Sequence, residues 1–157
     1  MIKLKGAGYM KIWVDGDACP KGVKEILFRV AERTKITVIF VANQYLRLPA
    51  IATLEMVQVG AGADVADDEI AERCAPEDLV ITADIPLAAR VVEAGALALD
   101  PRGTLYDRNN IGHILSMRNF MDELRGSGIE TGGPNSFGAK ERQKFANELD
   151  RLIAKRR

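Results

Sequence analysis

The hydrophobic and polar positions along this chain predict strands and helices in alternation. Short apolar runs rich in β-branched residues indicate strands, and apolar residues three or four positions apart indicate helices. The expected strands are Lys11–Asp15, Ile36–Ala42, Met56–Val59, Leu79–Ala83 and a weak last one at Ala96–Leu99. Such alternation implies a mainly parallel sheet covered by helices on both faces. We therefore expect an α/β protein, a three-layer α/β/α sandwich.

The expected helices lie between and after these strands. One follows Pro20, and the others are Asp64–Cys74, Pro86–Glu93, residues 111–124 with an apolar face, and Ala139–Lys155. Residues 43–53 indicate a loop or a short helix, and the Gly- and Pro-rich segment 126–138 indicates a loop. The last helix is expected to dock through Phe145, Leu149, Leu152 and Ile153. We expect residues 1–9 to be an N-terminal extension and residues 10–157 to form a single domain.

Composition excludes several classes of protein. Hydrophobic residues make up 47% of the 157 residues and charged ones 28%, which favours a packed core over disorder. No apolar run reaches the ~20 residues of a membrane span, and the first nine residues lack the apolar stretch of a secretory signal. The two cysteines, Cys19 and Cys74, have no metal-ligand spacing. We therefore expect reduced thiols in a cytoplasmic protein that does not contact a membrane.

The net charge of zero hides an uneven distribution along the chain. Residues 1–54 carry nine basic and four acidic side chains (+5), residues 55–100 carry two and eleven (−9), and residues 101–157 carry eleven and seven (+4). An acidic middle between basic ends is typical of a metal site bordered by a phosphate-binding surface, although an ordinary mixed surface has similar counts. The overall balance argues against a protein that coats duplex DNA.

Aspartates gather where three of the expected strands end. After the first, third and fourth strands come, respectively, Asp15 and Asp17, then Asp64, Asp67 and Asp68, then Asp84. In an open α/β sheet, ligands bind at the carboxyl ends of the strands, and like charges gathered there repel unless a cation lies between them. Carboxylate oxygens suit Mg²⁺ and Mn²⁺, so metal-assisted phosphate chemistry is the leading function. The predicted metal ligands are Asp15, Asp17, Asp64, Asp67 and Asp84.

Each of these acids also has a structural alternative. Asp17 could cap the helix near Pro20, and Asp64 could be the N-cap of the helix that it opens. Acids in a first helical turn also interact favourably with the helix dipole. Asp84 could equally serve as a cap or turn residue. Capping explains only one or two of the acids after the third strand, because three on one helix face repel each other.

The candidates for substrate binding are a hydroxyl and dispersed basic groups. Thr82 could orient a water or a phosphate. A basic cluster follows the 126–138 loop at a helix start, where the dipole prefers acids, and this favours anion binding. Arg47 and Arg102 are further candidates for a basic rim around the acidic site. The basic cluster is Lys140, Arg142 and Lys144.

Two other motifs carry less weight. Gly60-Ala61-Gly62 before a helix resembles part of a dinucleotide loop, but it lacks the third glycine and is followed by acids. His113 is the only histidine and lies among apolar helix residues, which disfavours a histidine-based triad or a zinc site.

Several motifs together resemble one bacterial family. Trp13-Val14-Asp15-Gly16-Asp17-Ala18-Cys19-Pro20 is similar to the opening motif of the YaiI/YqxD family. The resemblance continues through Val41–Gln44, Asp64–Asp67, Ile81–Ala88, Met117–Met121, Thr131–Pro134 and Lys140–Arg142. That family is similar to PIN-like nuclease domains, which hold Mg²⁺ or Mn²⁺ with aspartates at strand ends and cut RNA or single-stranded nucleic acid. The resemblance implies a PIN-like fold, carries the metal role to Asp15, Asp64, Asp67 and Asp84 with Asp17 as an extra acid, and adds Asn43 as a substrate-binding candidate.

The leading hypothesis is a metal-dependent nuclease in which Asp15 and Asp84 ligate the metal and Asp67 binds it or orients the attacking water. One alternative is a non-catalytic, metal-dependent module that binds RNA or protein. Another is a haloacid-dehalogenase-like phosphatase, whose paired acids and threonine are mimicked by Asp15, Asp17 and Thr82. In the phosphatases the second acidic pair follows the threonine, whereas Asp67-Asp68 precedes it. Cleavage of single-stranded RNA with Mn²⁺ separates these hypotheses.

Overall fold

The fold is built on one six-stranded sheet. The computed structural model describes residues 10–62, 64–132 and 136–156, so the predicted N-terminal extension and the Gly133-Pro134 pair lie outside the described residues. The strand order is β3-β2-β1-β4-β5-β6. The strands are β1 (Ile12–Asp15), β2 (Val38–Ala42), β3 (Leu54–Gln58), β4 (Leu79–Ile81), β5 (Leu97–Leu99) and β6 (Leu105–Tyr106). Strands β1 to β5 pair in parallel, and β6 pairs antiparallel with β5.

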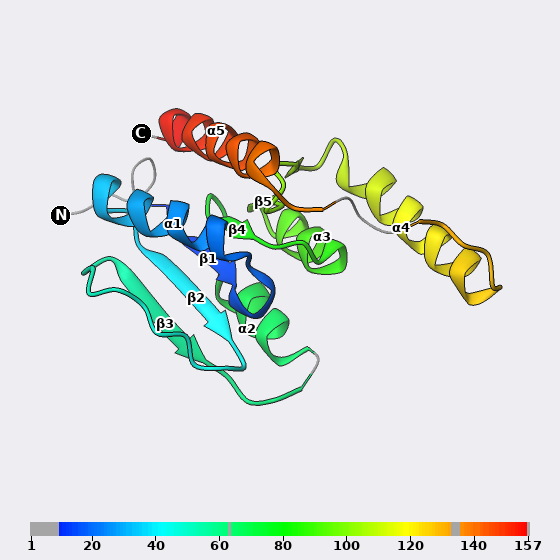
Figure 1. The fold of residues 1–157 in the computed structure, drawn as a ribbon, viewed down its shortest axis with the longest axis horizontal. Helices are drawn as coiled ribbons and strands as arrows, with labels where there is room; N and C mark the ends of the chain where they lie inside the picture. Colours follow the sequence, from blue (N-terminus) through cyan, green and yellow to red (C-terminus); the bar gives the residue numbers. More distant parts are fainter. Residues whose placement is uncertain (1–9, 63, 133–135, 157) are drawn as a thin grey trace.

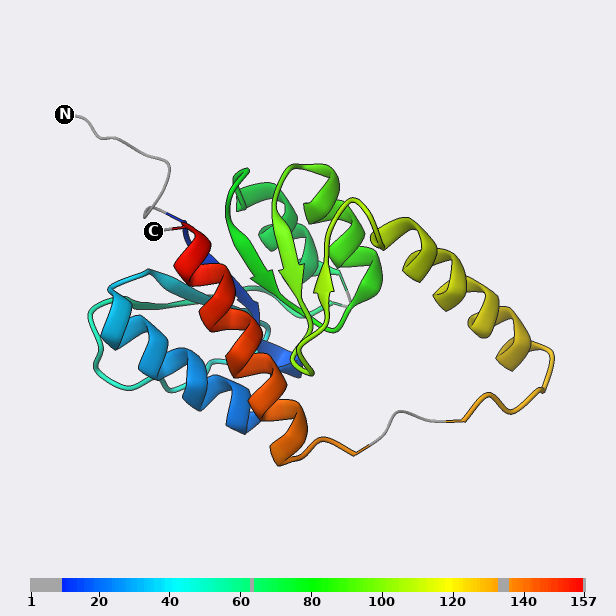
Figure 2. The ribbon, with the colours of Figure 1, turned by 90° about the horizontal axis from the view of Figure 1, so that it is seen from above.

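Helices cover both faces of this sheet, as Figures 1 and 2 show. The helices are α1 (Lys21–Thr34), α2 (Val65–Arg73), α3 (Ile85–Glu93), α4 (Ile111–Gly126) and α5 (Ala139–Arg156), and a short 3₁₀ turn, η1 (Gly16–Ala18), follows β1. Helices α1 and α5 pack on one face, and α2 and α3 pack on the other. The predicted three-layer α/β/α sandwich with a mainly parallel sheet is confirmed. No helix in the described part of the chain is both long and apolar enough to span a bilayer.

Alternation of side chains along β1 supplies both cores. Ile12 and Val14 point into the layer that holds α1 and α5, whereas Trp13 points into the layer that holds α2 and α3. Phe145 and Leu149 of α5 are fully buried against the first of these layers, so the predicted docking of the last helix is confirmed. Residues 43–53 form a loop, the first of the two predicted alternatives.

The last strand, β6, was missed by the hydrophobic pattern. Two residues are too few to show any periodicity, and β6 forms only because a tight turn after β5 brings it back alongside. In that turn Asp100 accepts a hydrogen bond from the Gly103 amide (2.8 Å) and donates its own amide to Thr104 (2.9 Å). Gly103 has φ +97°, a conformation that side chains disfavour. A residue with a side chain would also collide with Lys144 of α5.

The strand order places a topological switch point between β1 and β4. Strands β2 and β3 follow β1 on one side of the sheet, and the chain then crosses over to add β4 and β5 on the other side. At such a point the loops after the two central strands leave in opposite directions, which opens a crevice at their carboxyl ends. The residues that end β1 and β4 therefore occupy the position where open α/β sheets bind their ligands.

At the amino ends of the strands, a buried carboxylate connects the start of β1 to the loop between α2 and β4. Asp78 is 5% exposed. Its oxygens accept hydrogen bonds from the Trp13 indole nitrogen (3.0 Å), the Lys11 amide (3.0 Å) and the Ala75 amide (2.9 Å). Because three donors depend on this one side chain, Asp78 is a structural residue and not part of the site at the carboxyl ends.

Candidate functional site

Three side chains meet at the switch point. Asp15 is the last residue of β1, and Thr82 directly follows β4. The Thr82 hydroxyl donates to Asp15 Oδ2 (3.1 Å) and accepts from the Asp84 amide (2.9 Å). Asp84 is the N-cap of α3, and its Oδ1 accepts from the Leu87 amide (2.8 Å). The capping role and the strand-end role proposed for Asp84 are therefore compatible.

Helix α2 brings a third carboxylate to these two. The carboxyl of Asp67 lies within reach of the Asp84 carboxylate, and a hydrogen bond between the two favours the protonated form of Asp67. Burial, repulsion from Asp84 and Asp15, this hydrogen bond and the nearby Asp64 raise the pKa of Asp67 to about 6. Burial also raises the pKa of Asp15, against the Thr82 hydrogen bond, and Asp84 and Asp17 add to the rise. Asp15, Asp67 and Asp84 thus form one electrostatically coupled group, which we call the acidic cluster.

The acidic cluster fits a hard cation in its donor chemistry. Its donors are carboxylate oxygens at a sheet edge, the ligands that Mg²⁺ and Mn²⁺ prefer. Within the described residues, no three His, Cys, Asp or Glu side chains are arranged to hold a metal ion as they stand. The acidic cluster therefore fits a cation by the type of its donor atoms, by its position in the fold and by the repulsion between its carboxylates. Its described side chains are not already arranged as a coordination sphere. The nearby Cys19 thiol offers no alternative ligand, because burial raises its pKa to about 12.

The other predicted acids have different surroundings. Both Asp17 oxygens accept from loop amides, those of Asn43 (2.7 Å) and Gln44 (3.4 Å), so Asp17 anchors the loop after β2. It does not cap α1, whose N-cap is Pro20 without a side-chain bond. Asp64 is exposed and is the N-cap residue of α2, but its side chain makes no capping hydrogen bond there. The negative charge of Asp17 raises the pKa of Asp15, and that of Asp64 raises the pKa of Asp67. Asp17 and Asp64 therefore act on the site through their charge.

The remaining acid of that set, Asp68, turns away from the cluster. Its carboxylate forms an ion pair with Arg90 of α3 (2.8 Å), and both side chains are about half exposed. Asp67 and Asp68 are neighbours on one helix, yet only Asp67 faces the switch point. Asp68 is thus a matched control for charge changes within the cluster.

Two of the predicted substrate-binding residues are occupied by internal contacts. Thr82 is 1% exposed, and its hydroxyl lies between Asp15 and the Asp84 amide. The Asn43 side chain donates to the Gly60 carbonyl (2.7 Å). Both residues therefore shape the site from within. Arg47, by contrast, is exposed on the loop that Asp17 anchors.

The basic residues of α5 lie beside the same edge of the sheet. Arg142 packs so closely over Gly22, in the first turn of α1, that a Cβ there would be 2.3 Å from its Cδ. Lys144 packs in the same way over Gly103, in the turn after β5 (2.6 Å). Lys140 precedes them in the first turn of α5 and is exposed. Since α1 begins and β5 ends at the carboxyl ends of the strands, this part of α5 lies at the same end of the sheet as the acidic cluster. Figure 2 shows the first half of α5 running past this end of the sheet.

Two residues at this edge were missed by sequence reasoning. Asp100 follows β5, so the strand-end rule applied to the other aspartates would have found it. Its oxygens accept from the Arg102 amide (2.6 Å) and the Tyr106 hydroxyl (3.3 Å), and burial raises its pKa. Tyr45 has no local motif, and only the structure reveals it as a 68% exposed aromatic on the anchored loop. Its neighbour Leu46 packs against Gly16, which holds the loop beside the turn that follows β1.

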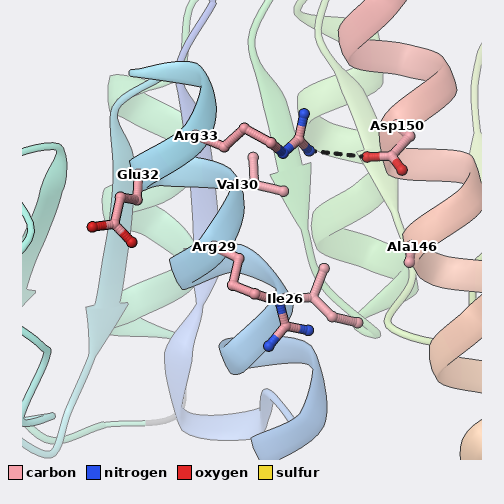
Figure 3. A pocket seen from close by; sticks show the side chains of 7 residues that line it. All are labelled: Ile26, Arg29, Val30, Glu32, Arg33, Ala146 and Asp150. Atoms are coloured by element: carbon pink, nitrogen blue, oxygen red, sulfur yellow. Dashed lines mark hydrogen bonds and ion pairs between the residues drawn. The ribbon is translucent and has the colours of Figure 1, made fainter.

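A separate hollow of about 430 Å³ lies between α1 and α5 (Figure 3). Its lining includes Ile26, Arg29 and Ala146, and the Arg33–Asp150 ion pair (3.2 Å) borders it. The charges there are balanced, and the hollow lies along the second half of α1, whereas the first turn of α1 faces the carboxyl edge. We therefore place the candidate site at the acidic cluster.

The raised pKa of Asp67 predicts a pH-dependent stability for the metal-free protein. Folded Asp67 takes up its proton near pH 6, whereas the unfolded chain does so near its ordinary value of 3.8. The folded state therefore binds more protons in this window, and its stability falls as the pH rises through it. Asp67→Asn should remove that loss and raise the free energy of unfolding above about pH 7 by on the order of 1 kcal/mol, after allowance for solvent screening.

Urea denaturation in EDTA at about pH 5 and about pH 8 measures this difference. Asp68→Asn is the control and should show no gain at the higher pH, because it loses only an exposed ion pair. A loss of stability in Asp67→Asn at the higher pH would contradict the repulsion that the structure implies.

Comparison with known proteins supplies the family. A model described as "Uncharacterized BCR, YaiI/YqxD family" matches residues 13–155. The chain is 59% identical over 146 residues to a UPF0178 protein of Shewanella loihica, which covers 93% of this chain and 97% of the relative. It is 56% identical over 147 residues to one of Pseudoalteromonas atlantica (94% and 100%) and 58% identical over 144 residues to one of Proteus mirabilis (92% and 95%). No solved structure matches the chain. The chain therefore belongs to the YaiI/YqxD family.

Proposed function

We propose that this chain is a divalent-cation-dependent phosphodiester hydrolase of the cytoplasm that cuts RNA or single-stranded nucleic acid, as PIN-like domains do. The observation that carries the proposal is the coupling of Asp15, Asp67 and Asp84 at the switch point of the sheet. The charge of Asp84 raises the pKa of both Asp15 and Asp67, so these carboxylates are costly to keep together, and a bound cation would relieve that cost. The two free thiols are in keeping with a reducing compartment.

The residues of the cluster would divide the work between them. Asp15 and Asp84 would hold Mg²⁺ or Mn²⁺, with Asp67 completing the site and Asp17 and Asp64 adding negative charge. When bound, the ion supplies positive charge to the scissile phosphate and lowers the pKa of a water molecule. Asp67, at the rim, would orient the attacking water and accept its proton. The buried Thr82 hydroxyl keeps the Asp15 carboxylate in one orientation.

The surroundings suit a single strand of nucleic acid. Lys140, Arg142 and Lys144 lie at the same end of the sheet as the acidic cluster and would neutralise phosphates that the cluster itself repels. On the other side, Arg47 could contact a phosphate, and the exposed ring of Tyr45 could stack against a base. A basic rim and an aromatic surface around an acidic centre are the elements from which single-strand channels are built.

The direct test is cleavage of end-labelled single-stranded RNA and DNA by the purified protein. We expect cleavage with Mn²⁺ or Mg²⁺ that stops on addition of EDTA and resumes when the metal is restored. A product ladder that is unchanged by EDTA would contradict the metal dependence. If the protein binds RNA but does not cut it with either metal, the nuclease proposal fails.

The basic rim makes a separate prediction about binding. Replacing Lys140, Arg142 and Lys144 together with Ala should weaken binding of single-stranded RNA and lower the magnitude of the slope of log K against log[salt] by about two, at ~0.7 per lost phosphate contact. Titration of a fluorescent oligonucleotide in EDTA at several salt concentrations measures both quantities. The Mn²⁺-induced rise in melting temperature should stay the same, because none of the three is a proposed ligand. An unchanged salt slope would mean that α5 is only a docking helix.

A non-catalytic binding module is the second candidate. The observation in its favour is that no three of the described His, Cys, Asp and Glu side chains are arranged to hold a metal as they stand. A haloacid-dehalogenase-like phosphatase is a weaker candidate, because Asp17, which would be its general acid, is engaged with loop amides. The cleavage assay decides between the first two, and a phosphomonoester substrate tests the third.

A further inference from the structure

Helix α4 projects from the body of the protein (Figure 2). Its first turn packs on the domain through Ile111 and Ile114, and none of its 16 residues is buried. Beyond that turn, Met117 is 45% exposed and Phe120 is 52% exposed. Large apolar side chains on a solvated helix are unfavourable unless another surface covers them.

Beyond the first turn, the apolar residues of this helix form a stripe. Met117, Met121 and Leu124 follow one another at intervals of four and three residues, and Phe120 flanks them. Met117 and Phe120 are exposed, and Met121 and Leu124 are partly exposed. This is the spacing by which one helix packs along another in a coiled coil. The spacing of the stripe therefore favours another helix as its partner.

We propose that the partner is α4 of a second copy of this chain, packed antiparallel about a two-fold axis. When the axis passes position 119, Met117 of each copy faces Met121 of the other. The stripe is thus complementary to itself in one register, as an isologous interface requires. In the same register, the two Phe120 rings meet across the axis.

The charges beside the stripe support a second copy over a nucleic acid. Helix α4 carries two acidic and two basic side chains, and Asp122 pairs with both Arg118 (3.4 Å) and Arg125. The charges of the helix are therefore balanced, so two copies of it do not repel each other. A polyanion would find no surface of single positive sign on this helix.

The size of the helix limits the strength of the contact. Sixteen residues of α-helix extend about 24 Å. One helix pair of that length is smaller than the ~800 Å² per partner of a typical stable interface. We therefore expect a reversible dimer whose fraction rises with protein concentration.

Sedimentation equilibrium from micromolar to hundreds of micromolar protein tests the proposal. The unchanged chain should shift from the mass of one chain towards twice that mass. Met117→Glu with Phe120→Glu should keep the mass of one chain throughout. The matched control, Gly112→Glu with Asn119→Glu, adds the same charge on the opposite side of the helix, where a side chain at position 112 meets nothing, and should still dimerise. Circular dichroism checks that each variant is folded.

Cross-linking separates the antiparallel arrangement from a parallel one. Phe120→Cys should form a disulfide-linked dimer on mild oxidation, because the two positions face each other across the axis. Met117→Cys should not, since its neighbour is Met121 of the other copy. A parallel pair would give the reverse result and overturn the proposed register. A chain that stays monomeric at every concentration, or a dimer that survives both glutamates, would overturn the proposal itself; neither outcome depends on nuclease activity.

Discussion

Asp84→Asn is expected to abolish metal-dependent cleavage while it leaves the fold intact. Asn is as good an N-cap as Asp, so the hydrogen bond that begins α3 at Leu87 can still form. The substitution removes one negative charge from the acidic cluster and, with it, a proposed metal ligand. Loss of groups that merely support a ligand costs about 10- to 100-fold. Loss of the ligand itself should therefore exceed ~100-fold in kcat/KM.

The control for this variant is Asp68→Asn. It removes the same charge from a residue that lies next to Asp67 in the chain but pairs with Arg90, away from the cluster. Its cleavage rate should stay within about twofold of the unchanged protein, as for surface changes generally. Single-turnover rates with Mn²⁺ for all three proteins give the comparison. If Asp84→Asn retains full activity with an unchanged metal optimum, the site does not lie at the switch point.

Asp78→Ala should cause the largest loss of stability. The substitution leaves the Trp13 indole N–H without its acceptor in a buried place, and the amides of Lys11 and Ala75 without theirs in partly buried places. Each buried donor left unpaired costs free energy, and water can enter only part of the space left by the Asp78 carboxyl group. We expect the free energy of unfolding to fall by about 3 kcal/mol.

Urea denaturation with tryptophan fluorescence follows this change directly, because Trp13 is the only tryptophan. Asp150→Ala serves as the control: it breaks an ion pair with Arg33 whose side chains are more than half exposed, and should cost less than ~0.5 kcal/mol. Equal losses in the two variants would show that the Asp78 network is not a structural anchor.

Local sequence patterns were sufficient to predict the layers of the fold. Alternation of strand and helix signals predicted the parallel sheet, and the apolar face of the last helix predicted that it docks. These features depend on residues close together in the chain, where hydrophobic periodicity directly reports which side faces the core. Strand β6 was missed because its pairing depends on the turn at Gly103 and on β5, and its own two residues carry no such signal.

For the candidate site, too, the sequence determined some features and the tertiary structure decided others. The chain by itself determined that Asp15 and Asp84 lie at the carboxyl edge, because Asp15 ends one strand of a parallel sheet and Asp84 comes shortly after another. Only the tertiary structure decided that β1 and β4 are neighbours, that α2 turns Asp67 and not Asp68 towards Asp84, and that Asp17 holds a loop. Strand order and helix packing angles come from contacts between distant segments, so a local pattern can place a side chain at an edge but cannot choose its partner.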